Sequence, residues 1–286
     1  MNSKIILILG GDDRSLYLGE YLEKQSFQVC YYAFSDVDCF NSLSEAVTHA
    51  DCIILPLPFT RDRVTLNTPL FDEKVQISDI CALATPDKMF FGGQLPKSFT
   101  ENLDLRGVEY CDYFTLEELA VYNAVPTAEG VIEILINNLP ITVFSIKCAV
   151  TGYGKVGKAV ANTLKSLGAE VTVYARKQKD IADACTKGLK AFTFDELKSG
   201  EKDYDVVINT VPATVLGKEE MENLKTDCLL VETASPPFGI DFQAAKEHAL
   251  SVIKANSLPG KVAPKSAGEI IGKTIMPIII KKGLIT

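Results

Sequence analysis

Short apolar runs of strand length alternate with stretches of helical period from one end of the chain to the other. This alternation is typical of parallel sheets, because parallel neighbours need a long crossover connection that is usually a helix. It predicts an α/β protein with two Rossmann-like doubly wound parallel-sheet domains. The predicted strands are Lys4–Leu9, Phe27–Tyr32, Asp51–Leu57, Met89–Phe91, Val108–Cys111, Ile146–Thr151, Glu170–Ala175, Val206–Thr210, Leu229–Thr233 and Ser251–Ala255.

A glycine-rich turn follows the strand that ends at Thr151 and opens a predicted helix. Gly152 permits a tight turn, Gly154 lets a ligand approach the backbone, and Gly157 lets the helix pack close to the strand. The helix N-terminus offers N–H groups and partial positive charge to phosphates. A merely tight turn is the alternative, but the strand–turn–helix context favours dinucleotide binding. The predicted phosphate-binding residues are Gly152, Tyr153, Gly154, Lys155, Val156 and Gly157.

The end of the next predicted strand bears on which dinucleotide is bound. Sites for NAD place an acidic residue there, on the ribose 2′-hydroxyl. This chain has Ala175, Arg176 and Lys177 instead, with Lys179 close behind. A guanidinium suits a 2′-phosphate, so we predict NADP; a solvated basic turn is the alternative.

Two more predicted strands end in short runs of small, polar and proline residues. Because the carboxyl ends of parallel strands meet at one edge of a sheet, we expect both runs beside the nicotinamide ribose. The cofactor-binding residues predicted there are Asn209, Thr210, Val211, Pro212, Ala234 and Ser235.

A helix predicted over Val125–Pro140 separates the two sets of strands, with Pro126 at a position that suits a helix N-terminus. The 286 residues are more than one core usually serves. We predict a substrate domain at residues 1–125 and an NADP-binding domain at 126–286, with an interdomain cleft beside the helix. Packing of the C-terminal helix back on the first domain is left open.

Charge and composition exclude several classes of partner. The formal net charge is −8, which disfavours a nucleic-acid surface. No stretch approaches the roughly 18 apolar residues that cross a bilayer, and the first apolar run is too short for a signal peptide. The eight cysteines include no CxxC pair and there are only two histidines, so we expect reduced thiols and no metal. These features predict a cytoplasmic protein without a membrane partner.

Arg14 follows the first strand through Gly10, Gly11, Asp12 and Asp13. An arginine between a strand's carboxyl end and a helix's amino end could hold an anionic ligand. In the alternative, the two aspartates cap the helix and Arg14 is solvated. Two other arginines, at positions 61 and 63, could also meet a carboxylate, but we favour surface loop charges there.

Several separated motifs together resemble the family of the dipicolinate synthase A subunit over residues 4 to about 275. They are GGDDR at 10–14, YNAVPTAEG at 122–130, GYGKVG at 152–157, AR at 175–176, INTVP at 208–212 and LPGKVAPKSAG at 258–268. The resemblance implies an NADP-linked oxidoreductase of sporulating bacteria that converts 4-hydroxy-tetrahydrodipicolinate to dipicolinate. It also implies the flavoprotein-like B subunit of dipicolinate synthase as partner, which leaves open a flavin on that partner. The sequence at 234–242 departs from the family pattern.

Within this resemblance, the motifs that have no cofactor task supply the candidates for substrate binding. Arg14 and Lys265 would bind carboxylates, and Asp12 would orient Arg14. Asn123 and Thr127 would hydrogen-bond the dicarboxylate substrate at the connecting helix. For Lys265 the alternative is a solvated member of a loose basic series near the C-terminus.

Glu129 is predicted on the first turn of the connecting helix, facing the cleft, where it would accept the proton. A glutamate that only complements the helix dipole is the alternative. The predicted catalytic residues are thus Glu129, Lys265 and Asn123. A related amino- or hydroxy-acid dehydrogenase and a non-catalytic NADP-binding regulatory protein remain alternative functions, and we expect a homo-oligomer.

Overall fold

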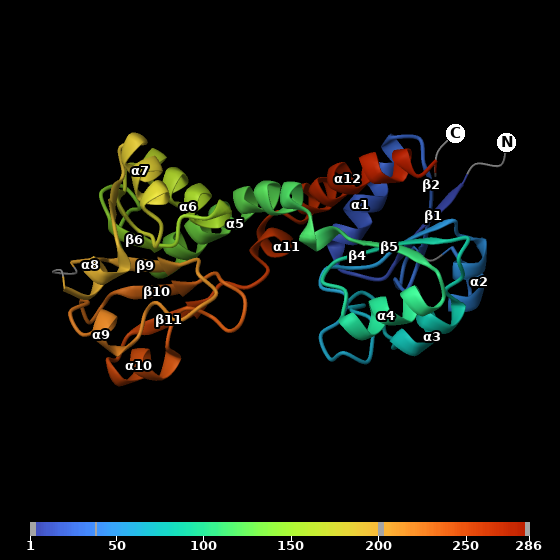
Figure 1. Cartoon of the computed structure of the whole chain (residues 1–286), viewed down its shortest axis with the longest axis horizontal. Helices are drawn as coiled ribbons and strands as arrows, with labels where there is room; N and C mark the ends of the chain where they lie inside the picture. Colours follow the sequence, from blue (N-terminus) through green and yellow to red (C-terminus); the bar gives the residue numbers. More distant parts are fainter. Residues whose placement is uncertain (1–3, 38, 200–202, 284–286) are drawn as a thin grey trace. The chain divides into compact units, whose positions relative to one another are not determined.

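The computed structural model describes residues 4–37, 39–199 and 203–283 and divides the chain into two compact units (Figure 1). Unit 1 takes the part of the chain up to Asn123 together with the part from Ala263, and unit 2 is Ala124–Val262. Each unit is built on its own parallel sheet with helices on both faces. The prediction of two Rossmann-like doubly wound domains is confirmed. The cleft between them stays a prediction.

Unit 1 contains a five-stranded sheet in the order β2-β1-β3-β4-β5. Helices α2, α3 and α4 cover one face, and α1 and α12 cover the other. The elements are β1 (Ile5–Leu9), α1 (Asp13–Lys24), β2 (Gln28–Tyr32), α2 (Leu43–His49), β3 (Cys52–Ile54), α3 (Ile77–Leu83), β4 (Met89–Gly92), α4 (Lys97–Leu105), β5 (Glu109–Asp112), the 3₁₀ turn η1 (Tyr113–Thr115) and α12 (Pro264–Lys281). The strand order reverses between β1 and β3, the point where open α/β sheets bind ligands.

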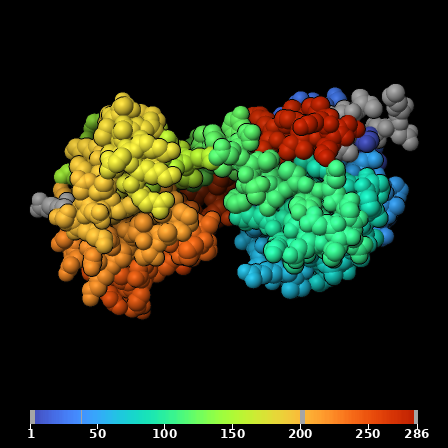
Figure 2. All heavy atoms as spheres, in the orientation of Figure 1, coloured from blue at the N-terminus to red at the C-terminus, as the bar shows by residue number. Residues whose placement is uncertain are grey.

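Helix α12 packs on α1, and Figure 2 shows its red atoms against the rest of unit 1. Two glycines make this close approach possible. A Cβ on Gly268 would lie 2.4 Å from the backbone oxygen of Arg14, and one on Gly272 would lie 2.3 Å from the Tyr21 ring. The C-terminal helix thus packs back on the first domain, the possibility that the sequence left open, and unit 2 ends at Val262 rather than at the predicted boundary of 286.

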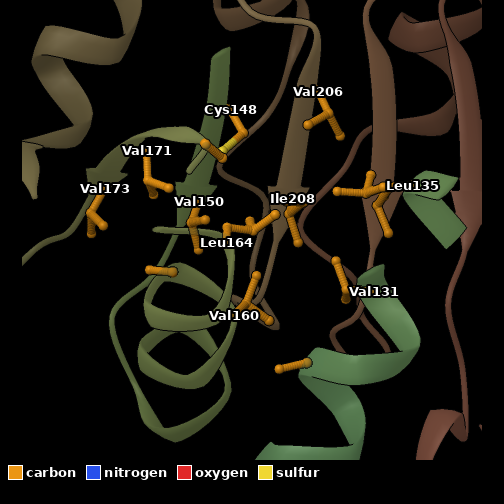
Figure 3. Packing of buried hydrophobic residues seen from close by; sticks show 14 of the residues in the cluster. Val131, Leu135, Cys148, Val150, Val160, Leu164, Val171, Val173, Val206 and Ile208 are labelled. Atoms are coloured by element: carbon orange, nitrogen blue, oxygen red, sulfur yellow. The ribbon is translucent and has the colours of Figure 1, made fainter. Parts of the chain in front are cut away.

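Unit 2 contains a six-stranded sheet in the order β11-β10-β9-β6-β7-β8. Its elements are β6 (Lys147–Thr151), α6 (Lys155–Ser166), β7 (Glu170–Tyr174), α7 (Gln178–Thr186), β8 (Lys190–Phe192), α8 (Phe194–Ser199), β9 (Val206–Asn209), α9 (Lys218–Met221), β10 (Leu229–Glu232), α10 (Phe242–Glu247), β11 (Ser251–Lys254) and α11 (Leu258–Val262). Figure 3 shows Val160 and Leu164 of α6 facing Val150 of β6 and Ile208 of β9. The switch in strand order lies between β6 and β9.

Helix α5 (Glu117–Asn138) runs from unit 1 into unit 2. It begins nine residues before Pro126, so the prediction that Pro126 starts the helix is wrong. Because proline lacks an N–H group, Pro126 removes one backbone hydrogen bond from α5. The segment keeps its helical form because Leu119 packs in the core of unit 1 and Val131 in that of unit 2.

In length and composition, α5 could also cross a membrane, with a mean hydropathy of 1.4 over its most apolar window. From the sequence we expected no segment of this kind. Of that window 39% is buried within the protein, and core helices of soluble proteins also pass this test of length and composition. The expectation of no membrane partner stays a prediction.

A buried carboxylate fixes the loops that follow β9 and β10. Glu232 has no exposed surface, and its Oε1 accepts hydrogen bonds from Asn209 Nδ2 (2.6 Å) and the Ala234 N–H (2.9 Å). Its Oε2 accepts from the N–H groups of Gly239 (2.8 Å) and Ile240 (2.9 Å). Four donors compensate the loss of hydration that burial imposes on a carboxylate. The two loops are therefore tied to a single side chain.

Replacing Glu232 by Gln keeps the shape of the side chain but turns one oxygen into an NH₂ group that faces two donors. Each buried donor left unsatisfied costs about 1–3 kcal/mol, so we expect the free energy of unfolding to fall by about 2–6 kcal/mol. Urea denaturation measures this change. The control is Glu222→Gln at an exposed position, which should stay within about 0.5 kcal/mol. Equal stability of Glu232→Gln and wild type would contradict the expectation.

Candidate functional site

The glycine turn after β6 is shaped by close backbone contacts on one side and is open on the other. Gly152 has a φ of +92°, and a Cβ there would lie 2.6 Å from Thr210 Oγ1. A Cβ on Gly157 would lie 2.3 Å from the backbone oxygen of Gly152, so α6 starts almost in contact with the turn. A Cβ on Gly154 would meet no described heavy atom within 4 Å. The turn thus leaves space for a ligand at Gly154.

Helix α6 begins directly after Gly154, its N-cap, and no side chain caps it. Its first N–H groups and its dipole point toward the open side of the turn. The Tyr153 ring is buried in the core of unit 2, where burial raises the pKa of its hydroxyl. Lys155 is exposed and Val156 half-buried. No side chain described here blocks Gly154, so these residues fit the diphosphate of a dinucleotide.

The loops after β9 and β10 meet the glycine turn through hydrogen bonds. Thr151 Oγ1 donates to Asn209 Oδ1 (2.7 Å), and Thr210 Oγ1 donates to the Thr151 oxygen (2.8 Å). The backbone N–H of Val211 donates to the same Asn209 Oδ1 (3.1 Å). These contacts bring the ends of β6 and β9 together as the sheet order requires. Beside them lie the exposed Pro212 and Ser235 and the buried Ala234.

The end of β7 carries the cations on which the cofactor preference depends. Ala175 is buried, and its N–H donates to the Phe192 oxygen (3.0 Å). Arg176 and Lys177 are both exposed. In the described part of the chain, no hydrogen bond or ion pair engages the side chain of either residue. Both cations are therefore available to an anion at this strand end.

In unit 1, the turn after β1 holds a buried arginine. Asp12 caps α1 and accepts two hydrogen bonds from the Arg14 guanidinium, from Nε (2.9 Å) and Nη2 (2.8 Å). Nη2 also donates to the backbone oxygen of Leu57 in the loop after β3. Arg14 is only 7% exposed, so it is not the solvated side chain of the alternative interpretation. Among the described residues, Nη1 has no partner and keeps its donors for a ligand.

Helix α12 brings Lys265 toward the same end of the sheet. Gly268 contacts Arg14 and Leu18, while Gly272 contacts Leu18 and Tyr21, so α1 and α12 run side by side in the same direction. Their N-termini therefore lie at one end, where two helix dipoles favour an anion. Lys265 is exposed on the first turn of α12, one turn before Gly268. The structure thus brings Asp12, Arg14 and Lys265 into one region of unit 1.

The candidates on α5 do not share one face. Asn123 and Thr127 are both half-buried and four residues apart, so they lie on the same side of the helix. Glu129 is exposed and, at about 100° per residue, lies about 200° around the axis from Thr127. It is twelve residues past the start of the helix at Glu117, so the prediction of a first-turn position is wrong.

Two buried polar residues were not predicted from the sequence. They are Glu232, which holds the end of β9 and the segment after β10, and Asn67 in the loop after β3. An acidic residue at the end of the apolar run Leu229–Glu232 was the available signal, because such a run predicts a buried strand. For Asn67 the sequence offers no comparable signal. Among the described residues, no group of His, Cys, Asp or Glu is arranged to hold a metal ion.

Two family models match successive parts of the chain. Residues 5–114 match the N-terminal domain of the dipicolinate synthase A subunit. Residues 138–237 match the D-isomer specific 2-hydroxyacid dehydrogenase, NAD binding domain. Unit 2 is therefore a nicotinamide-dinucleotide-binding domain of the dehydrogenase type, which supports an oxidoreductase.

The relatives that are 26–30% identical over nearly the whole chain carry one name. The dipicolinate synthase A subunit of Bacillus subtilis (strain 168) is 30% identical over 284 residues, 96% of this chain and 95% of the relative. The crystal structure of the same protein from Bacillus halodurans has a TM-score of 0.89 and 26% identity, and covers 97% of this chain and 98% of its own. That of the Bacillus subtilis protein has a TM-score of 0.88 and 29% identity, with 98% and 97% coverage. The resemblance seen in the sequence is confirmed, and the chain belongs to the family of the dipicolinate synthase A subunit.

Proposed function

We propose that this chain binds NADP on unit 2 and oxidises 4-hydroxy-tetrahydrodipicolinate, with loss of water, to dipicolinate. The observation that carries the proposal is the open backbone at Gly154, at the uncapped start of α6, in a chain of this family. A dinucleotide site there supplies an electron acceptor. The buried Arg14, paired with the half-buried Asp12 in unit 1, supplies an anchor for a carboxylate.

The choice of NADP over NAD rests on the end of β7. An acidic residue there would bind the ribose 2′-hydroxyl of NAD and repel a 2′-phosphate. The chain instead has the exposed Arg176 and Lys177 after the buried Ala175. A guanidinium can donate two parallel hydrogen bonds to a phosphate, which supports NADP.

The reaction needs positioning more than bond activation. The ring loses water, then a hydride and a proton, and becomes aromatic, which favours the product. NADP, held by the glycine turn at Gly154 and by Arg176, would supply the hydride acceptor. In our proposal Arg14 and Lys265 hold a carboxylate, Asn123 and Thr127 hydrogen-bond the substrate, and Glu129 takes the proton. Fixing the ring in one orientation lowers the barrier through proximity.

The family is named for one of two kinds of subunit, which implies a partner. We propose that the chain works with the B subunit of dipicolinate synthase in the cytoplasm of a sporulating cell, and that it forms a homo-oligomer. A flavin, if the reaction uses one, would belong to the B subunit, because the dinucleotide site of this chain is accounted for by NADP.

Arg176→Ala should weaken NADP binding about 10- to 100-fold and change NAD binding little, because only NADP carries the 2′-phosphate. Calorimetric titration of the whole chain with each dinucleotide measures both affinities. Lys246→Ala, at an exposed position on α10, is the control and should bind both as wild type does. A wild-type preference for NAD that Arg176→Ala leaves unchanged would rule out the NADP assignment.

Glu129→Gln should lower kcat about 100- to 10,000-fold through loss of proton transfer.

Lys265→Ala should lower kcat/KM about 10- to 100-fold through loss of a carboxylate contact. NADPH formation with the substrate and the B subunit present, together with mass analysis of the product, measures both effects. The controls are Glu133→Gln on α5 and Lys273→Ala on α12, both exposed. Unchanged turnover in a test variant would remove that residue from the site.

A further inference from the structure

The loop after β3 holds a second guanidinium in a fixed orientation. Arg61 is exposed, and its Nε donates a hydrogen bond of 3.0 Å to Oδ1 of Asn67. A guanidinium bound at Nε keeps its two terminal nitrogens as a fork that matches the two oxygens of a carboxylate. Within residues 4–37, 39–199 and 203–283, the Arg61 side chain makes no other hydrogen bond and no ion pair.

The buried side chain of Asn67 lowers the stability of the protein, and this loss is explained if Asn67 orients Arg61. Its side chain is 94% buried, since only 6% of the residue is exposed, and its Nδ2 finds no hydrogen-bond acceptor in the described part of the chain. A buried amide nitrogen without a partner is unfavourable, and a leucine of similar size would avoid that loss. What a leucine cannot supply is the Oδ1 acceptor. We infer that Asn67 is a positioning residue for Arg61.

The loop that carries Arg61 is held rigidly. Asp62 Oδ1 accepts from the N–H groups of Val64 and Thr65, both at 2.8 Å, and Thr60 Oγ1 donates to the Thr65 oxygen (2.6 Å). The hydrogen bonds from Thr65 hold the pKa of Asp62 well below its usual range. Arg61 is therefore fixed by its own backbone as well as by Asn67.

Arg61 and Arg14 are attached to the same stretch of unit 1. Arg14 Nη2 donates to the Leu57 oxygen, and the Asn67 N–H donates to the Phe59 oxygen (2.9 Å), two residues further along. The Asn67 backbone also lies against the turn after β1, 3.7 Å from the position of a Cβ on Gly10. Two oriented guanidinium groups thus lie at the point where the strand order reverses between β1 and β3.

We propose that Arg61, oriented by Asn67, binds the second carboxylate of the substrate, while Arg14 binds the first. This rests on the proposed function, because a substrate with two carboxylates is what requires two guanidinium groups. It replaces our expectation that Arg61 is a solvated loop charge. Arg61 then determines specificity: it favours a dicarboxylate over the corresponding monocarboxylate.

Arg61→Gln tests the proposal through ligand binding rather than turnover. The whole chain, with and without NADP, is titrated with pyridine-2,6-dicarboxylate, pyridine-2-carboxylate and glutarate in a calorimeter. We expect Arg61→Gln to weaken binding of both dicarboxylates about 10- to 100-fold and binding of the monocarboxylate less than about 3-fold. Arg63→Gln is the matched control. It lies in the same loop, is also exposed, and has no hydrogen bond or ion pair of its side chain among the described residues.

Asn67→Leu should reproduce the selective loss of dicarboxylate binding, since an unheld Arg61 no longer presents its fork in place. A general structural effect would instead weaken all three ligands alike and lower the melting temperature. If Asn67→Leu does not fold, the exposed Arg61→Gln variant still decides the question.

The outcomes separate the two proposals. Equal dicarboxylate binding by Arg61→Gln and wild type overturns the role of Arg61 and leaves the proposed function intact. A third outcome is that wild type binds glutarate, Arg61→Gln does not, and neither binds pyridine-2,6-dicarboxylate. This outcome upholds the role of Arg61 and overturns the proposed substrate. A wild-type chain that binds none of the three compounds overturns both.

Discussion

The nucleotide-binding edge of unit 2 depends on the burial of one negative charge. Glu232 is removed from water, and four donors replace its hydration, one from the last residue of β9 and three from the segment after β10. One of these residues, Asn209, also accepts a hydrogen bond from Thr151 Oγ1 at the end of β6. Thr210 Oγ1 donates to the backbone oxygen of Thr151. The glycine turn, two loops and three strand ends are thereby one connected network. A site preorganised in this way loses little entropy when a ligand binds.

Unit 1 reaches a comparable result by different means. Asp12, Arg14 and Lys265 lie where two helices begin, because Gly268 and Gly272 let α12 lie in contact with α1. Asp12 serves both as the N-cap of α1 and as the partner of Arg14. One residue thus stabilises the helix and sets the direction of the guanidinium. The two units resemble each other in topology, yet each orients its polar groups with a different part of the same architecture.

The sequence was informative where sterics or solvent exposure alone decide the structure. Strands such as Ile5–Leu9 and Val206–Asn209 are covered on both faces, so their continuous apolar runs are visible without tertiary knowledge. The glycine turn was predictable because each glycine answers a separate steric need. Arg14 was recognised as a candidate from its place between a strand and a helix.

What could not be predicted depends on contacts between distant residues. Pro126 is typical of a helix start, and only packing in both cores explains why α5 begins at Glu117. The apolar run before Glu232 indicates a buried strand, but the donors that hold its carboxylate become evident only once Asn209 and Gly239 lie around it. Arg61 is indistinguishable from Arg63 in sequence, and the hydrogen bond to Asn67 alone separates them. The partner of α12 lies at the opposite end of the chain.

That last feature bears on how the protein is made. Unit 2 is one uninterrupted stretch, whereas unit 1 is assembled from two stretches that flank it. A ribosome must therefore finish all of unit 2 before the last helix of unit 1 emerges, and until then the apolar side of α1 lacks its cover. Since domains usually fold as units during synthesis, unit 2 can be folded while unit 1 still lacks α12. Unit 2 is thus an insertion within unit 1, and losing α12 would damage a unit whose larger part precedes unit 2 in the chain.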